Sequence, residues 1–336
     1  MRLLILGGTV FLGRALTDRA IARGHTVTHL HRGRSAGTDR RVETLVCDRE
    51  EIPFMRGIDA ARTWDAVVDT CGFLPQVVCR SAEALRDRVG TYAFVSSISA
   101  YASFESEGFD EDAPLQADPD PWPAERSPEL YGALKAACER VVAKSFEKRA
   151  LIVRPGLIVG PHDPTDRFTW WPWRIARGGA FVAPGRPERA IQFIDVRDVA
   201  DWTIAMLESS AVGTFQVNGP ERPLTMSELI DACRALRDDA APEWVPDDFL
   251  VRHEVRPWTE MPLWIPEGEA AYRGFMAASI ERALRHGLEL RPLADTVADT
   301  LRWAKERPAT HEWKAGIAPE REVALLDAWR KDEASR

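Results

Sequence analysis

The sequence lacks long apolar runs, paired cysteines and any excess of positive charge. No apolar stretch approaches the roughly 18 residues that a membrane-spanning helix needs, and the N-terminal run ends at Gly7 without the pattern of a cleavable signal. The five cysteines are scattered and none forms a Cys-x-x-Cys pair, which argues against a disulfide framework or a zinc site. We therefore expect a soluble, cytoplasmic protein with reduced thiols, no bound metal and no membrane contact.

The charge balance is acidic. Lys and Arg together number 44 and Asp and Glu 52, which gives a formal net charge of -8. A protein that binds nucleic acid needs a broad basic face to neutralise phosphates. The expected partner is therefore a small-molecule substrate and not nucleic acid. The 336 residues contain no internal repeat, low-complexity tract or flexible linker, so we expect one compact body.

Apolar segments alternate with helical patterns through the first half of the chain. Such alternation is typical of right-handed βαβ units, which build a parallel sheet covered on both faces. It predicts an α/β fold with a doubly wound parallel sheet. The acidic, proline-rich segment 103–128 interrupts the pattern and is predicted to be a long surface loop. The expected strands lie near 2–6, 26–30, 42–46, 65–69, 91–95 and 151–154, and the expected helices near 11–23, 74–88, 128–148, 195–207 and 226–236.

The first apolar segment runs into the glycine-rich stretch Gly7-Gly8-Thr9-Val10-Phe11-Leu12-Gly13 and then into an amphipathic stretch. Glycines let the backbone approach a dinucleotide pyrophosphate, whose charge is met by free N–H groups and the positive end of the helix. The spacing G-x-x-G-x-x-G places Val10 where the middle glycine belongs, so the motif alone is only moderately specific. The alternative is an ordinary tight strand-to-helix turn.

Tyr131 and Lys135 are four residues apart, which puts a phenol and an ammonium on the same face of one helix. A nearby cation favours the ionised phenolate, so such a tyrosine can exchange protons with a substrate hydroxyl or carbonyl. This spacing also occurs by chance on many helices. Upstream, Ser96 and Ser97 follow an apolar strand, and the carboxyl ends of parallel strands are where open sheets bind ligands.

The glycine turn, the strand-end serines and the Tyr-Lys helix, in this order, resemble the short-chain dehydrogenase/reductase superfamily. The similarity is to its extended branch of NAD(P)-dependent epimerases and dehydratases. Three further segments agree with it: 151–161, the late strand-to-helix segment 193–200, and the acidic motif 110–114. The resemblance covers residues 1–220 well and the rest loosely, and it implies a Rossmann domain with a small C-terminal α/β substrate-binding annex.

The resemblance also implies roles for individual residues. Tyr131 would donate and accept the proton, Lys135 would hold the nicotinamide ribose, and Ser97 would hydrogen-bond the substrate oxygen, with Ser96 as the alternative for that last role. The serines could instead be strand-end or capping hydroxyls. The residues expected to contact the cofactor are Gly7, Thr9, Val10, Phe11, Leu12, Gly13, His31, Arg32, Arg34, Asp48, Arg49, Cys71, Gly72, Ser96, Pro155 and Gly156.

Within that set, Asp48 and Arg49 would contact adenine, the backbone at 71–72 would pass the ribose, and Pro155 and Gly156 would lie near the nicotinamide amide. Cys71 is more simply a buried packing residue than a nucleophile, because no basic partner is near it in sequence.

The residue that ends the second strand bears on the choice of cofactor. An NAD-selective site would carry a carboxylate near His31 to accept a hydrogen bond from the ribose 2′-hydroxyl, and the sequence has none there. Arg32 and Arg34 could instead pair with a 2′-phosphate. We therefore expect NADP(H) to be preferred, with NAD(H) possible, unless these arginines are merely solvated.

Two departures from the nucleotide-sugar enzymes concern the substrate. Leu157 and Ile191 stand where those enzymes usually have an Asn and an Arg for the substrate diphosphate, and Arg189 is a candidate replacement. The tryptophan-rich stretches 170–173 and 258–264 fit a pocket for a less charged molecule. The alternative is that these tryptophans fill the core or an interface.

The sequence therefore predicts an NADP-dependent oxidoreductase that moves hydride between nicotinamide and a small-molecule carbonyl or alcohol. The alternatives are a sugar or nucleotide-sugar epimerase or dehydratase and, in another class, a non-catalytic redox-sensing or RNA-associated protein. We expect cofactor binding by 1–160 with 190–218, substrate binding by 161–189 and 219–310, and a helical tail at 311–336. A homodimer is possible through the Tyr-Lys helix and the helix before it, with apolar contacts from Ala133, Leu134, Ala137 and Val141.

Overall fold

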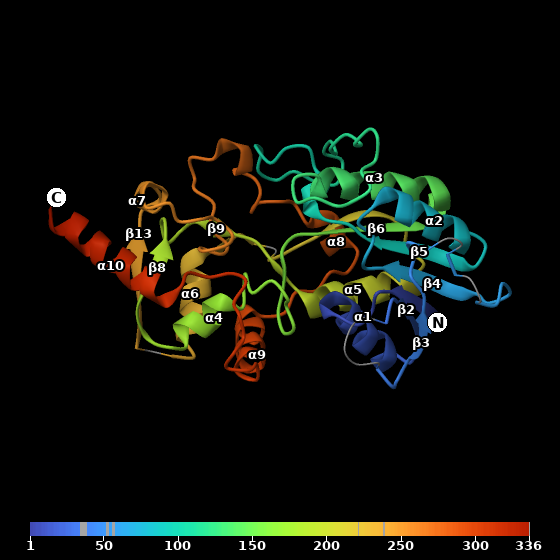
Figure 1. The fold of residues 1–336 in the computed structure, drawn as a ribbon, viewed down its shortest axis with the longest axis horizontal. Helices are drawn as coiled ribbons and strands as arrows, with labels where there is room; N and C mark the ends of the chain where they lie inside the picture. Colours follow the sequence, from blue (N-terminus) through green and yellow to red (C-terminus); the bar gives the residue numbers. More distant parts are fainter. Residues whose placement is uncertain (34–38, 52–53, 56–57, 221, 238, 336) are drawn as a thin grey trace.

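A seven-stranded parallel sheet forms the centre of the first lobe in the computed structural model (Figure 1). The structure describes residues 1–33, 39–51, 54–55, 58–220, 222–237 and 239–335. The strand order is β11-β6-β5-β4-β1-β2-β3, and each neighbouring pair is parallel. The strands are β1 (Arg2–Leu6), β2 (Thr26–His31), β3 (Glu43–Val46), β4 (Trp64–Asp69), β5 (Val89–Val95), β6 (Ala150–Pro155) and β11 (Gly213–Val217).

Helices cover both faces of this sheet. In Figure 1, α2 (Pro75–Leu85) and α3 (Tyr131–Phe146) lie above it, and α1 (Phe11–Ala22) and α5 (Val196–Glu208) lie below. Successive side chains of a strand point to opposite faces. Leu3 and Ile5 therefore pack in the α1/α5 core, and Leu4 and Leu6 in the α2/α3 core. This confirms the predicted doubly wound Rossmann sheet.

The predicted helix 128–148 begins three residues late, at Tyr131. The residues before it form a turn, in which the Ser127 hydroxyl accepts a hydrogen bond from the Leu130 amide and the Pro128 carbonyl accepts one from the Tyr131 amide. Such side-chain bonds to the backbone compete with helix formation. The segment 103–128 contains no helix or strand, as predicted, and a bridge between Tyr101 and Leu115 closes its first part.

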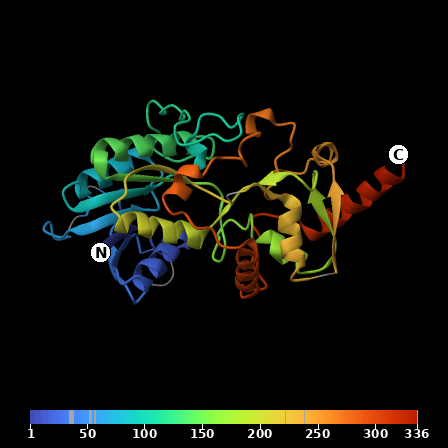
Figure 2. The same ribbon diagram turned by 180° about the vertical axis from the view of Figure 1, so that it is seen from behind.

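The second lobe has its own apolar core, at the end of the molecule opposite the large sheet (Figure 2). The C-terminal helix α10 contributes Leu325, Leu326 and Trp329 to this core. The remaining helices are α4 (Trp170–Ile175), α6 (Met226–Arg234), α7 (Asp247–Arg252), α8 (Glu281–Arg285) and α9 (Leu293–Lys305), with α10 at Pro319–Ala334. The strand pairs are β7 (Ile158–Val159) with β10 (Ile194–Asp195), β9 (Ala190–Ile191) with β12 (Leu224–Thr225), and β8 (Gly179–Pro184) with β13 (Ala240–Val245).

The expectation that the tryptophan-rich stretches wall a ligand pocket is wrong for three of their members. Trp170, Trp171 and Trp264 are at most 2% exposed and belong to the core of the second lobe. The indole N–H of Trp171 donates to the Pro262 carbonyl, and that of Trp264 to Asp247. The indole N–H of a buried Trp usually donates a hydrogen bond. In Trp171 and Trp264 the acceptors lie within the second lobe, so these N–H groups are not available to a ligand.

The apolar residues offered for a dimer contact face inward. Ala133, Leu134 and Ala137 are buried within the chain and Val141 is half-buried. Most of their apolar surface packs α3 against its own lobe, and the homodimer stays a prediction. In the described part of the chain, no helix is both long enough and apolar enough to cross a membrane.

Candidate active site

The turn between β1 and α1 requires glycine at three positions. Gly7 and Gly8 have φ of 105° and 88°, which L side chains rarely adopt. A Cβ on Gly8 would lie 2.6 Å from the His29 ring, and one on Gly13 would lie 2.6 Å from the Gly8 Cα. Val10 has an extended backbone with φ of -130° and is 55% exposed. The fold therefore does not need the missing middle glycine.

The start of α1 fits a dinucleotide pyrophosphate. Among the described residues, no side chain caps this helix end, so its first backbone amides are not satisfied by a side chain of the chain itself. The helix dipole favours a negative charge at the same place. Both features lie at the carboxyl edge of the sheet, where open parallel sheets bind ligands.

Tyr131 and Lys135 lie at this edge on the first turns of α3. Tyr131 is the first residue of the helix and is 37% exposed, whereas Lys135 is only 3% exposed. The Lys135 ammonium donates to the Gly72 carbonyl at 2.9 Å and to the Val95 carbonyl at 2.6 Å. Two of its three donors are therefore used in fixing it between the ends of β4 and β5, and one is left for a ligand or the phenol.

The serine turn after β5 packs directly against the same helix. A Cβ on Gly132 would lie 2.1 Å from the Ser99 carbonyl oxygen, so α3 and the turn touch through backbone. The Ser97 hydroxyl accepts a hydrogen bond from the Ser99 amide at 3.1 Å. The Ser96 hydroxyl is buried and has no hydrogen-bond partner among the described residues. This contact brings Ser97 and Tyr131 to one side of the sheet edge.

Arg49 points into the protein. Its guanidinium donates to both carboxylate oxygens of Asp69 at 2.7 Å, and the Tyr92 hydroxyl donates to the same carboxylate at 2.8 Å. Burial opposes ionisation of Asp69, but the ion pair with Arg49 outweighs it and holds the Asp69 pKa below its usual value. Arg49 thus fixes the end of β4, and the hydrogen bonds of its guanidinium go to side chains of the protein itself.

The neighbouring loop after β4 passes close to the expected ribose site. A Cβ on Gly72 would lie 2.5 Å from the Phe94 ring, so only glycine fits there. Burial raises the pKa of the Cys71 thiol, which keeps it protonated and agrees with a packing role. Asp48 lies beside Arg49 and its carboxylate accepts from the Glu50 amide at 3.0 Å.

His31 ends β2, at the position that bears on the choice of cofactor. Its Nδ1 accepts a hydrogen bond from the Gly33 amide at 3.0 Å, and burial lowers its pKa. A neutral His31 therefore carries its proton on Nε2. Arg32 beside it is exposed, and Arg34 lies outside the described residues.

Sequence reasoning missed Asn218, which lies beside the expected nicotinamide contacts. Pro155 ends β6 and Gly156 follows it, and a Cβ on Gly156 would lie 2.2 Å from the Asn218 side-chain amide nitrogen. Asn218 is 1% exposed and donates to the Gln192 side chain at 2.9 Å. Asn218 directly follows β11, and a polar residue at the carboxyl end of a parallel strand reaches the ligand-binding edge. No strand was predicted there from the sequence, so this signal was missed.

A buried ion pair between Glu139 and Arg154 was also missed. Glu139 lies two turns beyond Tyr131 on α3, and its carboxylate accepts from Arg154 at 2.7 Å. Arg154 also donates to the Glu111 carbonyl at 3.0 Å. The Glu111 carboxylate in turn accepts from the Gln216 amide at 2.7 Å. These contacts tie the acidic motif 110–114 and helix α3 to the strands beneath them.

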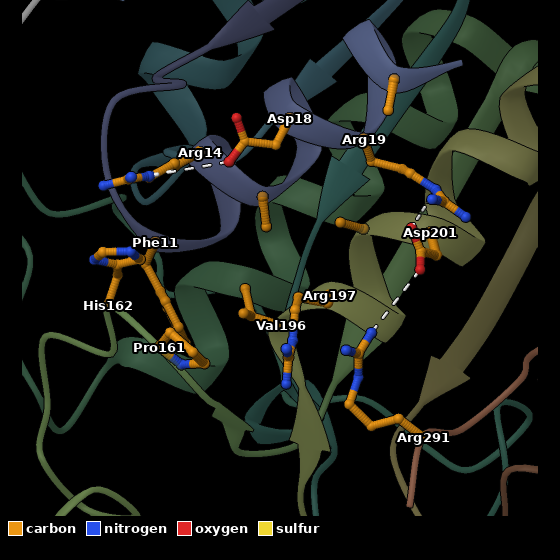
Figure 3. Close-up of a pocket in the computed structure, with 13 residues that line it drawn as sticks. Phe11, Arg14, Asp18, Arg19, Pro161, His162, Val196, Arg197, Asp201 and Arg291 are labelled. Carbon is orange, nitrogen blue, oxygen red and sulfur yellow. Dashed lines mark ion pairs between the residues drawn. The ribbon is translucent and has the colours of Figure 1, made fainter. Parts of the chain in front are cut away.

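Two cavities lie outside this edge. The smaller, of about 460 Å³, runs between α1 and α5 (Figure 3). It contains Phe11, but its charged side chains pair with one another, as Arg19 does with Asp201. The larger, of about 750 Å³, lies in the second lobe. Neither is lined by Ser97, Tyr131 or Lys135. Within the described ranges, no group of three His, Cys, Asp or Glu residues could hold a metal.

The fold and the residues at its carboxyl edge define a dinucleotide-binding α/β protein of the extended short-chain dehydrogenase/reductase type. The chain belongs to the NAD dependent epimerase/dehydratase family, which it matches over residues 3–217. This confirms the resemblance inferred from the sequence.

Three similar proteins illustrate the range of the family. Over 261 residues the chain is 25% identical to the chloroplast stem-loop binding protein of 41 kDa b of Arabidopsis thaliana. The aligned region makes up 73% of this chain and 65% of that protein. The UDP-glucuronic acid 4-epimerase of Bacillus cereus, solved with NAD, is 15% identical, with a TM-score of 0.64 over 91% of this chain and 99% of that one. Human epimerase family protein SDR39U1, solved with NADPH, is 19% identical, with a TM-score of 0.58 over 91% and 100%. At these identities, the two solved structures establish the fold alone.

Proposed function

We propose that the protein is an NADP(H)-dependent oxidoreductase acting on a small-molecule carbonyl or alcohol. The observation that carries the proposal is the fixed Lys135 ammonium one turn beyond the exposed Tyr131, on the sheet edge that also carries the glycine turn. A positioned phenol with a neighbouring cation is suited to proton transfer. Bound at the glycine turn, the nicotinamide would supply or accept the hydride.

Each residue of the edge has a task in carbonyl reduction. The Ser97 hydroxyl hydrogen-bonds the carbonyl oxygen and orients it, with Ser96 as the alternative. Tyr131 gives its phenolic proton to that oxygen as the carbonyl carbon gains hydride, which leaves an alcohol and a phenolate. The Lys135 ammonium stabilises the phenolate until a solvent proton restores it. In alcohol oxidation the same transfers run in reverse.

The preference for NADP(H) rests on the end of β2. The Nε2 proton of a neutral His31 is a donor where an NAD-selective site needs an acceptor, and the exposed Arg32 adds a positive charge beside it. The NADPH in the SDR39U1 structure supports this choice, whereas the NAD in the Bacillus cereus epimerase shows the other option within the fold. We assign the remaining cofactor contacts as the sequence predicts them. Arg49 would contribute indirectly, by holding the Asp69 carboxylate at the end of β4.

We divide the chain as the sequence suggests. Residues 1–160 with 190–218 bind the cofactor, and 161–189 with 219–310 bind the substrate. The cavity of about 750 Å³, whose lining comes largely from 186–192 and 263–284, supports this division. Residues 311–336 form a tail whose helix packs on the second lobe.

Equilibrium titration with the two reduced cofactors tests the choice of cofactor. NADPH is expected to bind more tightly than NADH in wild type, and His31→Asp, which supplies the missing acceptor, is expected to reverse the order. Equal or tighter binding of NADH by wild type would contradict the preference for NADP(H). Consumption of NADPH with a panel of aldehydes and ketones tests the reaction type.

The second candidate is an epimerase or dehydratase that oxidises and re-reduces its substrate without net turnover of the cofactor. Membership of the epimerase/dehydratase family favours it. It differs from the first candidate in one observable, since the absorbance of the reduced cofactor stays unchanged while product forms. Its usual diphosphate contacts are replaced here by Leu157 and Ile191.

A further inference from the structure

We propose that the cavity of about 750 Å³ in the second lobe binds an uncharged, apolar end of the substrate. This inference rests on the proposed function, which places the reacting carbonyl at Tyr131. We call this space the tail cavity. It lies between residues 186–192, the prolines Pro220 and Pro223, and the segment 263–284. Its volume falls within the range of sites that enclose drug-sized molecules.

Apolar side chains form one part of the wall of the tail cavity. Ile191 and Leu263 are each 1% exposed, and Ala278 and Ile280 are each 5% exposed, so these side chains are held by the core behind them. Met276 and Ile265 are half-buried at the same wall. The free energy of binding to a fixed apolar surface is most favourable for a ligand that buries its own apolar surface there, because both surfaces then leave water.

Two of the three arginines that line the cavity are paired within the protein, whereas Arg273 is exposed. Arg189 is 6% exposed, pairs with Asp247 and donates to the Ile265 carbonyl. Arg186 pairs with Glu267 at 2.8 Å. An anionic ligand would have to compete for these guanidinium groups.

The charges that line the tail cavity also disfavour an anion. Its arginines are outnumbered by its glutamates, so the lining as a whole is slightly negative. A phosphate or carboxylate would meet this acidic lining, which disfavours such ligands by like-charge repulsion. An uncharged group leaves the existing ion pairs intact. The lining arginines are Arg186, Arg189 and Arg273, and the lining glutamates are Glu107, Glu267, Glu269 and Glu281.

One wall of the tail cavity connects it to the reacting edge. The Gln192 side chain lines the cavity and exchanges hydrogen bonds with the Ala278 backbone at 2.9 and 3.1 Å. The same side chain accepts from Asn218, which touches Gly156 beside the expected nicotinamide contacts. Two hydrogen-bonded side chains thus join the cavity wall to that turn, and in this proposal the carbonyl end of the substrate lies at the edge and its tail lies here.

Two fluorophores of opposite character test the binding chemistry without turnover. Nile red is neutral and anilinonaphthalene sulfonate is anionic, and both brighten in apolar sites. The full-length protein is expected to bind Nile red saturably and at least about tenfold more tightly than the sulfonate, since only the latter meets the acidic lining. UDP, the diphosphate probe, is expected not to displace Nile red. Tighter binding of the sulfonate, or displacement by UDP, overturns the proposal.

Substitutions locate the binding. Ile191→Arg places a cation on the apolar wall and is expected to weaken Nile red binding at least about tenfold. Met276→Lys, at a half-buried position, gives the same test if the first variant folds poorly. Val251→Arg, at a 54% exposed residue outside the cavity, is the control and is expected to change nothing. Nile red binding that survives both cavity substitutions contradicts the assignment.

Turnover separates this inference from the proposed function. Benzylacetone and levulinate are methyl ketones that differ in carrying a phenyl ring or a carboxylate. Wild type with NADPH is expected to show a KM at least about tenfold lower for benzylacetone. An equal or lower KM for levulinate overturns the apolar tail but leaves the oxidoreductase intact. Absence of NADPH binding overturns the proposed function, and the fluorophore titrations still decide what the cavity binds.

Discussion

The carboxyl edge of the large sheet and the tail cavity of the second lobe are built in different ways. At the edge, neighbouring atoms lie so close that Gly8, Gly72 and Gly132 admit no side chain, and the buried Lys135 ammonium donates to backbone carbonyls. In the tail cavity, side chains such as Ile191 and Leu263 supply an apolar wall without directed bonds.

This difference bears on how each region should respond to substitution. In the proposed function the edge positions a cofactor and a proton, and small displacements there would remove activity. An apolar wall tolerates substitution as long as its volume and polarity are kept. We therefore expect substitutions at the edge to abolish chemistry or stability, and comparable substitutions in the second lobe to change affinity or little else.

The largest contrast is expected between two tyrosines. Tyr131→Phe should lower kcat by about 10² to 10⁴-fold, because it removes the proton donor, and should leave the NADPH dissociation constant and the thermal midpoint unchanged. Tyr272→Phe, at a 48% exposed residue lining the tail cavity, should change kcat by less than about threefold, because the ring is kept. Steady-state kinetics measure both, and similar losses in the two variants would refute the contrast.

Two arginine ion pairs should differ in their contribution to stability. Arg49→Met leaves the Asp69 carboxylate buried and unpaired, so it should cost about 3 to 5 kcal/mol. Arg186→Met breaks an exposed pair with Glu267 in the second lobe and should cost at most about 1 kcal/mol. Urea unfolding at neutral pH gives both free energies. Equal costs would show that the Arg49 pair does not hold the edge.

Two glycines with positive φ test how closely other atoms approach the backbone of the glycine turn between β1 and α1. Gly8→Ala should cost about 3 to 4 kcal/mol, because the new Cβ meets the His29 ring in addition to the backbone strain. Gly287→Ala has φ of 79° and nothing within 4 Å, so it should cost only about 1 to 2 kcal/mol of strain. NADPH binding should be lost in the first variant alone. Urea unfolding and cofactor titration measure these effects.

The smallest expected effect concerns Asp163, which follows β7 between the two lobes. Burial raises its pKa to about 6, although hydrogen bonds from Thr165 oppose the shift. The folded protein therefore holds a proton that the unfolded chain releases near pH 4. Stability should fall by about 2 to 3 kcal/mol as pH rises from 4 to 7.

Asp163→Asn isolates this contribution, because the amide keeps an acceptor for Thr165 and does not titrate. Unfolding free energies of the two proteins across this pH range share every other titration, so their difference should carry the decline. Parallel curves for wild type and variant would mean that Asp163 ionises normally in the fold.

Local patterns predicted the sheet and most of the edge. The glycine turn, the alternation of strands and helices, and the Tyr131-Lys135 spacing each depend on neighbours in sequence, and the structure places Ser97 and Tyr131 on the same sheet edge as the glycine turn. The start of the Tyr131 helix was misplaced because the Ser127 and Pro128 turn depends on side-chain bonding that periodicity does not record.

Features set by long-range packing could not be predicted. The inward direction of Arg49 depends on Asp69, twenty residues away, and the Glu139–Arg154 pair joins a helix to a strand. Trp171 and Trp264 carry no sequence mark that distinguishes a core side chain from a pocket wall. Their burial follows from how the second lobe closes, which no motif encodes.

Transfer of isotope from the cofactor tests the central claim most directly. The protein is incubated with NADPH deuterated at the transferable position and with a panel of ketones, and the product mass and the remaining NADPH are measured together. The account predicts a single deuterium in each alcohol product, an equal loss of NADPH, and neither in Tyr131→Phe. NADPH that binds but stays constant, with no deuterated alcohol from any ketone, would contradict net reduction and favour the cofactor-conserving reaction of an epimerase or dehydratase.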